Sequence, residues 1–297
     1  MDAGFVYGGN IMIKLEQVSK LIGTFTLKNI NLEIPEGYII GLIGANGCGK
    51  TSLLHILMGL YKPDGGTVEL MGKQYVTAER ELHDSIGVVL QERLYEEYMT
   101  LQENAMYYGR FYSNYDESLF LQMLQQYELN PKQKYKSLSK GEELKFQFAF
   151  ALAHHPKLLI LDEPTGNFDP EFREEFLAAL KDFIADGEHT VILATHLTDD
   201  LDKMADYIIY MEKGTILLAT DIEDIRSRYR IVAGEDYRMK LLSEKRIVHM
   251  EKGEFSTKAL VRHRKIDEYD RSYTVTSPTI EEFMYFVTKR GKGVEIC

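Results

Sequence analysis

Hydrophobic and polar residues alternate near the start of the chain and then give way to an unbroken apolar run. Residues 13–20 (IKLEQVSK) alternate, and residues 25–44 (FTLKNINLEIPEGYIIGLIG) alternate before ending in consecutive apolar positions. Alternation is typical of strands with one buried face, whereas a continuous apolar run indicates a strand buried on both faces. We therefore predict paired strands that lead into one buried strand.

Three later segments repeat the buried-strand pattern. Residues 86–91, 158–163 and 189–195 are short, apolar and rich in β-branched side chains, and segments with helical periodicity separate them. This order favours an α/β fold with a largely parallel, buried sheet.

The strand pattern stops over about residues 92–156, where helical periodicity predicts a helical insertion. A hairpin is expected at 207–220, with its turn at Lys213-Gly214. Beyond it, short alternating runs and an amphipathic segment at 279–289 predict a small α+β domain. The predicted organisation is one domain over 12–225 and an accessory, dimerisation or regulatory domain over 226–297.

Charge limits the classes of protein that this chain can belong to. The chain has 297 residues, 44 % of them apolar, and a formal net charge of −11. It contains no apolar run long enough for a membrane span and no secretory signal, so we expect a cytoplasmic protein with no nucleic-acid partner. Residues 226–297 hold 16 Lys/Arg against 11 Asp/Glu, which marks a boundary near Ser227 in an otherwise acidic chain.

Cysteine and histidine usage excludes two further features. Of the two cysteines, Cys48 lies in a glycine-rich loop and Cys297 is the last residue, which argues against a disulfide. The eight histidines show no metal-ligand spacing, so no transition metal is expected. A thiolate in an anion-binding loop is stabilised, so alkylation of Cys48 is predicted to inactivate the protein.

A phosphate-binding motif stands between a predicted strand and a predicted helix. Gly44, Gly49, Lys50 and Thr51 satisfy G-x-x-x-x-G-K-[ST], whose backbone N–H groups and helix N-terminus bind phosphate oxygens. Lys50 is expected to reach the β- and γ-phosphates, and the Thr51 hydroxyl to ligate Mg²⁺. A flexible glycine turn is the alternative for the bare pattern.

A second polar group follows the apolar strand in LLILDEPT. Asp162 and Glu163 are predicted at the carboxyl edge of the sheet, where open α/β folds bind ligands. Asp162 is suited to hold Mg²⁺ through water, and Glu163 to polarise an attacking water.

Taken in order, these motifs resemble those of the ATP-binding subunits of ABC transporters over about residues 12–220. The match comprises GANGCGKT, Gln91 in VVLQE, LSKGE, LLILDEPT, GNFD and His196 in ATH. The resemblance implies a P-loop NTPase core with an antiparallel β subdomain and a helical insertion, followed by the small C-terminal α+β domain. It implies ATP and Mg²⁺ as cofactors.

The resemblance also implies roles for individual residues. Two subunits would face head to tail, so that the signature segment of one completes the ATP site of the other. The implied catalytic residues are Glu163, His196 and Gln91; the nucleotide-binding residues are Asn46, Gly47, Cys48, Gly49, Lys50, Thr51, Ser52, Ser139, Gly141 and Asp169; and the metal ligands are Thr51, Gln91 and Asp162.

Two residues depart from the usual Leu-Ser-Gly-Gly-Gln signature, namely Lys140 and Glu142. Ser139 and Glu142 form a capping-box pattern for the following helix, which gives Glu142 a structural role. A carboxylate near a γ-phosphate is repulsive, and Lys140 is expected to offset it. Where the family places an aromatic residue against adenine, this chain has Ile22. The two alternatives are that Phe25 takes the place of the aromatic residue or that the base contact is merely apolar.

Seven aromatic residues follow Gln91 closely, in the region where the family receives a coupling helix of the membrane subunit. They are Tyr95, Tyr98, Tyr107, Tyr108, Phe111, Tyr112 and Tyr115. Some are expected to anchor the partner and others to pack the helical insertion. For Tyr107 and Phe111, four apart on one helix face, packing is the alternative to anchoring.

The chain resembles exporter ATPases of the type-2 kind, which are encoded apart from their permease. The expected partners are an integral membrane permease and a second ATP-binding subunit, at the inner face of the cell membrane. The expected cargo is a peptide, drug or lipid-like molecule, and the alternative function is a soluble assembly motor.

Overall fold

The computed structural model describes residues 10–253, 256–263, 269 and 272–290. These residues form two compact units. The first runs to Leu197 and includes Tyr207–Ala219, and the second comprises Thr198–Asp206 and the chain from Thr220 onward. The assignment of 198–206 to the second unit has no counterpart in the predicted organisation, whose boundary at 225/226 stays a prediction.

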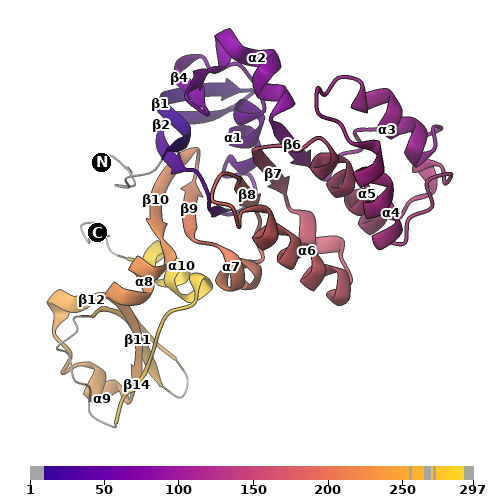
Figure 1. The fold of residues 1–297 in the computed structure, drawn as a ribbon. Helices are drawn as coiled ribbons and strands as arrows, with labels where there is room; N and C mark the ends of the chain where they lie inside the picture. Colours follow the sequence, from indigo (N-terminus) through magenta and orange to yellow (C-terminus); the bar gives the residue numbers. More distant parts are fainter. Residues whose placement is uncertain (1–9, 254–255, 264–268, 270–271, 291–297) are drawn as a thin grey trace. The chain divides into compact units, whose positions relative to one another are not determined.

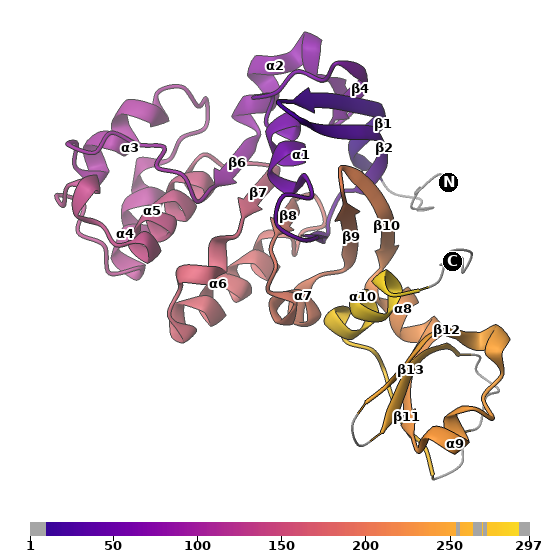
Figure 2. The same ribbon diagram turned by 180° about the vertical axis from the view of Figure 1, so that it is seen from behind.

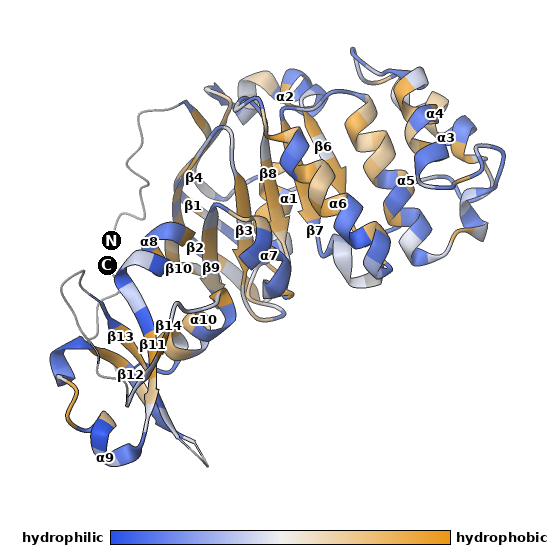
Figure 3. Cartoon of the chain, turned by 60° about the horizontal axis from the view of Figure 1, so that its bottom comes forward, coloured by the Kyte–Doolittle hydropathy of each residue, from blue (hydrophilic) through white to orange (hydrophobic). Residues whose placement is uncertain are grey.

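The first unit is built on a six-stranded sheet with the order β10-β9-β3-β8-β7-β6 (Figure 1). Its pairs β3·β8, β3·β9, β6·β7 and β7·β8 are parallel, as the apolar runs predict. The strands are β3 (Ile39–Ile43), β6 (Ile86–Val89), β7 (Leu158–Asp162), β8 (Thr190–Ala194), β9 (Tyr207–Glu212) and β10 (Thr215–Asp221). Every residue of β3 and β8 is buried, and Figure 3 shows this hydrophobic interior.

An antiparallel sheet with the order β2-β1-β4-β5 lies beside the first sheet. It comprises β1 (Ile11–Ile22), β2 (Phe25–Pro35), β4 (Gly65–Leu70) and β5 (Lys73–Gln74), and α2 (Tyr75–Asp84) follows it. The first two strands are the predicted pair. They cover one end of the core and bring Phe25 towards the loop that follows β3.

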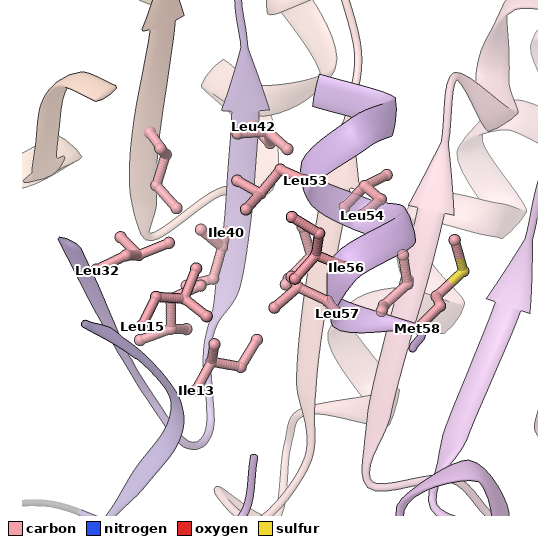
Figure 4. Close-up of a cluster of buried hydrophobic side chains, with 14 of the residues drawn as sticks. Ile13, Leu15, Leu32, Ile40, Leu42, Leu53, Leu54, Ile56, Leu57 and Met58 are labelled. Atoms are coloured by element: carbon pink, nitrogen blue, oxygen red, sulfur yellow. The ribbon is translucent and has the colours of Figure 1, made fainter. Parts of the chain in front are cut away.

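Helix α1 (Lys50–Leu57) packs into the core that the two sheets share. Figure 4 shows its Leu53 and Leu57 on the side of Ile40 of β3 and Ile13 of β1. Burying each such side chain stabilises the fold by about 1.5–3 kcal/mol. This packing fixes the position of the helix start, and with it the loop that precedes α1.

The predicted helical insertion is present between β6 and β7. It contains α3 (Leu101–Gly109), α4 (Glu117–Gln126), the short η1 (Tyr135–Ser137) and α5 (Lys140–Ala153). Figures 1 and 2 both show α3, α4 and α5 grouped together, and α5 packs against α4 and β6. After β7 come η2 (Pro164–Asn167) and α6 (Pro170–Phe183).

The second unit is an α+β structure with a four-stranded sheet in the order β12-β13-β11-β14. Helix α10 (Ile280–Thr288) packs on α7 (Thr198–Met204), and the Ile280 N–H donates to the Asp202 carboxylate at 3.1 Å. The other elements of the second unit are α8 (Ile222–Arg228), β11 (Tyr229–Gly234), α9 (Asp236–Met239), η3 (Glu244–Arg246), β12 (Ile247–Lys252), β13 (Thr257–Arg262) and β14 (Thr274–Thr276). No helix in the described part of the chain has the length and apolar character needed to cross a membrane.

Candidate nucleotide site

The loop between β3 and α1 is shaped by glycines that no other residue can replace without strain. Gly44 has a φ of 156°, and a Cβ there would lie 2.4 Å from the Met211 carbonyl oxygen. Gly49 has a φ of 113°, and a Cβ there would lie 2.8 Å from both Leu27 and Phe25. Positive φ values and close approach both favour glycine. The loop is therefore held tightly against β2 and β9.

Helix α1 presents a positively polarised end to this loop. Gly49 is the N-cap, no side chain caps the helix, and its first turn contains no acidic residue. The Lys50 side chain is 7 % exposed, and its ammonium donates to the Gly44 carbonyl at 2.9 Å. Backbone N–H groups at a helix start, a lysine ammonium and the helix dipole together make an anion site suited to phosphate.

Thr51 and Asp162 link the loop to the end of β7. The Thr51 hydroxyl donates to Asp162 Oδ2 at 2.8 Å. Burial raises the pKa of the Asp162 carboxyl, while the hydrogen bond from Thr51 acts in the opposite direction. Two hard oxygen donors thus lie together beside the anion site.

Glu163 follows Asp162 in a left-handed backbone conformation, with φ 50° and ψ 45°. Its N–H donates to the Ala194 carbonyl at 2.8 Å, which ties it to the end of β8. Its Oε2 accepts from the His196 N–H at 3.2 Å and lies 2.7 Å from His196 Nδ1. Its Oε1 lies 4.0 Å from Lys50 Nζ. The carboxylate is therefore oriented by its neighbours at the carboxyl edge of the sheet.

Gln91 reaches the same place from the end of β6. Its Nε2 donates to the Glu163 carbonyl oxygen at 3.2 Å. The amide oxygen of Gln91 is not used in this hydrogen bond. Residues that follow β6, β7 and β8 thus meet at one edge of the sheet, where the sequence predicts them.

These residues surround a pocket of about 560 Å³. Its lining comprises Ile22, Phe25, Asn46, Gly47, Gly49, Lys50, Thr51, Ser52, Gln91, Glu92, Asp162 and Glu163. Ile22 and Phe25 give the pocket an apolar wall, as the expected base contact requires. Glu92 is a lining residue that sequence reasoning missed, because no motif distinguishes it from its neighbour Gln91.

Five predicted site residues are not part of the lining. His196 acts on it indirectly, through Glu163, and Cys48 is buried beneath the loop with 5 % exposure. Asp169 caps α6 by accepting from the Phe172 N–H at 2.9 Å. Ser139 and Gly141 lie at the start of α5.

The start of α5 confirms the predicted capping box. The Ser139 N–H donates to Glu142 Oε2 at 2.7 Å, and the Glu142 N–H donates to Ser139 Oγ at 3.3 Å. The expectation that Lys140 offsets the repulsion between Glu142 and a γ-phosphate stays a prediction. Lys140 lies 3.3 Å from Glu143 and donates to the Gln91 carbonyl, while the side chain of Glu142 turns back to the helix cap.

This site combines a lysine inside a glycine loop, a hydroxyl paired with a carboxylate, and an oriented glutamate. These are the groups needed to bind a nucleoside triphosphate and to activate a water molecule for attack on it. The site therefore defines a nucleoside triphosphatase of the phosphate-loop class. The chain belongs to the family of ABC transporter ATP-binding proteins, and it is the ATP-hydrolysing subunit of such a transporter.

Comparisons with known proteins carry this assignment. The family model described as ABC transporter matches residues 27–166. The uncharacterized ABC transporter ATP-binding protein YdbJ of Bacillus subtilis is 33 % identical over 209 residues, which are 69 % of this chain and 68 % of YdbJ. The bacitracin transport ATP-binding protein BcrA of Enterococcus faecalis is 28 % identical over 222 residues, which are 74 % of this chain and 72 % of BcrA.

Solved structures agree on the fold. The dimeric, post-hydrolysis state of the ATP-binding cassette MJ0796 bound to ADP and Pi has 28 % identity and a TM-score of 0.63, covering 71 % of this chain and 98 % of the cassette. An ATP-binding subunit of an ABC transporter has a TM-score of 0.67 at 20 % identity, covering 72 % of this chain and 92 % of that subunit. The predicted fold class is thereby confirmed.

Proposed function

We propose that the 560 Å³ pocket holds ATP with its phosphates over the start of α1 and its base against Ile22 and Phe25. Lys50 and the backbone N–H groups of the loop bind the β- and γ-phosphates. The observation that carries this proposal is the convergence of Lys50, Asp162 and Glu163 on the glycine loop.

The donor set fits Mg²⁺ that arrives with the nucleotide. Thr51 and Asp162 offer a hydroxyl and a carboxylate oxygen 2.8 Å apart, and Gln91 has an amide oxygen. In the part of the chain that the structure describes, no group of three or more His, Cys, Asp or Glu side chains could hold a metal. Mg²⁺ commonly takes few protein ligands and completes its shell with phosphates and water. Bound there, it would offset the phosphate charge.

Glu163 is the residue proposed to polarise the attacking water. Its carboxylate is oriented by His196, which fixes the direction in which a proton is accepted. Removal of this group by Glu163→Gln should lower kcat by about a hundredfold or more, with ATP binding retained. An ATPase rate equal to that of the unmodified chain would overturn the proposed role.

We further propose that two ATP-binding subunits form a sandwich in which Ser139 and Gly141 of one face the ATP of the other, with Asp169 at the seam. Support comes from the position of Ser139 and Gly141 outside the pocket that the same chain forms, at the capped start of α5. The molar mass of the Glu163→Gln protein should double on addition of Mg·ATP. An unchanged mass would argue for a different ATP-binding partner.

A groove of about 850 Å³ is the proposed docking site for a helical segment of a membrane permease. It runs from α2 to the end of α3, and its lining includes Arg80, His83, Tyr108 and Phe111. Phe111 is 69 % exposed and Tyr107 is 39 % exposed, which favours anchoring of a partner over packing within the helical insertion. Exposed aromatic residues beside a groove suit an amphipathic helix of a partner.

The docking proposal places the chain at the inner face of the cell membrane. In its native cells the chain should sediment with membranes, and Phe111→Ser should release it. The matched control is Tyr237→Ser, an exposed aromatic residue of the second unit with 59 % exposure. A chain that stays in the supernatant before any substitution would favour the alternative of a soluble assembly motor.

Export of a peptide, drug or lipid-like molecule is the proposed direction of transport. The named relatives include the bacitracin transport protein BcrA and the Nod factor export ATP-binding protein I of Burkholderia lata, which is 31 % identical over 208 residues. Cells without this chain should be more sensitive to bacitracin-type peptides, and the Glu163→Gln chain should not restore resistance. Unaltered sensitivity would argue against peptide export.

A further inference from the structure

Four consecutive residues after β6 are each held by helix α5. The Leu90 N–H donates to Gln147 Oε1 at 2.8 Å, and Gln147 Nε2 donates to the Glu92 carbonyl at 3.2 Å. The Gln91 carbonyl accepts from the Lys140 ammonium, and the Arg93 side chain pairs with Glu143 at 2.8 Å. The side chain of Gln147 is fully buried, so this attachment is part of the core.

Glu143 is the centre of the attachment. Its side chain is 1 % exposed, and it lies 2.8 Å from Arg93 Nε and 3.3 Å from Lys140 Nζ. A buried carboxylate is costly unless cations and hydrogen bonds compensate it. Arg93 and Lys140 are each partly exposed, at 47 % and 35 %, so the buried charge is compensated from the protein surface.

Lys140 connects this charge cluster to the nucleotide pocket. Its ammonium binds the backbone carbonyl of Gln91, and the side chain of Gln91 in turn donates to the Glu163 carbonyl at 3.2 Å. Only a long side chain with several donors can reach both Glu143 and Gln91. The glycine of the usual signature has no side chain to make either contact.

We propose that Lys140 is a positioning residue for ATP hydrolysis, whose ammonium, held by Glu143, fixes the backbone of Gln91 and so places the Gln91 amide at the nucleotide pocket. The inference rests on the proposed function of that pocket. The start of α5, where Ser139 lies, is thereby joined through one side chain to the residue that reaches Glu163.

The test measures steady-state ATPase kcat and KM on the full chain. Lys140→Met should lower kcat by about tenfold, because a small displacement of a positioned group has effects of this order or larger, and should leave KM for Mg·ATP within about twofold. Lys132→Met, a substitution of an exposed lysine in the same insertion, is the matched control and should leave both constants unchanged.

A double-substitution cycle separates positioning from a general structural role. If Lys140 acts through Gln91, then Lys140→Met should cause no further loss of kcat in a Gln91→Ala background. An equal loss in both backgrounds, or a kcat unchanged by Lys140→Met, would overturn the inference.

A third variant guards against misfolding, since Lys140→Met leaves the buried Glu143 with one cation fewer. Lys140→Met combined with Glu143→Gln removes both charges and still lacks the ammonium on Gln91, so its kcat should be low as well. Wild-type kcat in this folded variant would also overturn the inference. Failure of the proposed function itself would be seen separately, as full ATPase activity in Glu163→Gln.

Discussion

The Nδ1 atom of His196 lies 2.7 Å from Oε2 of Glu163, and the backbone N–H of His196 donates to the same oxygen at 3.2 Å. A carboxylate oxygen only accepts, so Nδ1 carries the proton, and a neutral ring then has an accepting Nε2. His196 thus orients the Glu163 carboxylate, and that carboxylate in turn determines which ring nitrogen of His196 carries the proton.

We expect His196→Ala to lower the ATPase kcat by about a hundredfold, because Glu163 loses the group that orients it. The measurement is the steady-state rate at saturating Mg·ATP. His189→Ala is the control, since His189 pairs with Asp186 outside the pocket at 2.7 Å. A His196→Ala protein as active as the His189→Ala protein would contradict the role assigned to this contact.

Replacement of Gly49 should damage both the fold and ATP binding. Gly49→Ala places a Cβ 2.8 Å from Leu27 and Phe25 at a φ of 113°, so the loop must move away from β2. Gly23→Ala measures the cost of the positive φ alone. Gly23 also has a positive φ, +60°, but nothing would lie within 4 Å of a Cβ added there. We expect this backbone strain to lower the free energy of unfolding by about 1–2 kcal/mol.

Thermal unfolding and nucleotide titration should therefore rank the two glycine variants. Gly49→Ala should have the lower melting temperature and should bind ATP weakly. Gly23→Ala should lose some stability but bind ATP as the unmodified chain does. Equal melting temperatures would show that the contacts with Leu27 and Phe25 relax without cost.

The buried side chain of His154 is expected to make the free energy of unfolding sensitive to acid. It is 2 % exposed and stacks on Tyr112 at 4.0 Å, and burial lowers its pKa to about 4. A base whose pKa is lower in the folded than in the unfolded state stabilises the fold above the unfolded value of about 6.5. This contribution, about 3 kcal/mol at most, is lost as the pH falls from 6.5 to 4.

Urea unfolding at pH 7 and pH 4.5 tests this contribution. His154→Phe keeps an aromatic ring against Tyr112 and should lose less stability between the two pH values than the unmodified chain. His155→Asn, at an exposed position with a positive φ, should keep most of the pH dependence, because burial is the largest cause of the lowered His154 pKa and the charge of His155 is the smallest. An identical pH dependence in all three proteins would exclude His154 as the cause.

Cys48 should react with alkylating reagents more slowly than its place in the motif suggests. Its side chain is 5 % exposed and belongs to the hydrophobic core, so the reaction requires the loop to open. In a Cys297→Ser background a maleimide should label Cys48 slowly in native protein and quickly in urea. Rapid stoichiometric labelling without denaturant would contradict this expectation.

The parts of the fold that sequence reasoning predicted are those set by local pattern. Continuous apolar runs identify β3, β7 and β8, and the glycine loop, Asp162 and Glu163 follow from where these strands end. Cys297 lies outside the residues that the structure describes. The expected absence of a disulfide between Cys48 and Cys297 therefore stays a prediction.

Contacts made across the fold could not be predicted in the same way. Lys140 turns to Gln91 and Glu143, and residues 198–206 join the second unit, because tertiary packing selects these partners. No periodicity of the sequence encodes that choice. The sequence left the exposure of Phe111 open for a related reason: four-residue spacing shows that two side chains share a face, but not whether that face is covered.

The capping box of α5 has a consequence for how substitutions of Ser139 must be read. Its Oγ accepts from the Glu142 N–H at 3.3 Å, which occupies a lone pair but leaves the hydroxyl proton able to rotate towards another acceptor. One atom can therefore begin a helix and donate to an anion at once. Ser139→Ala removes both abilities, whereas Ser139→Asp retains the cap and brings repulsion in place of a donor. Only the pair of variants can assign a loss of activity to one or the other.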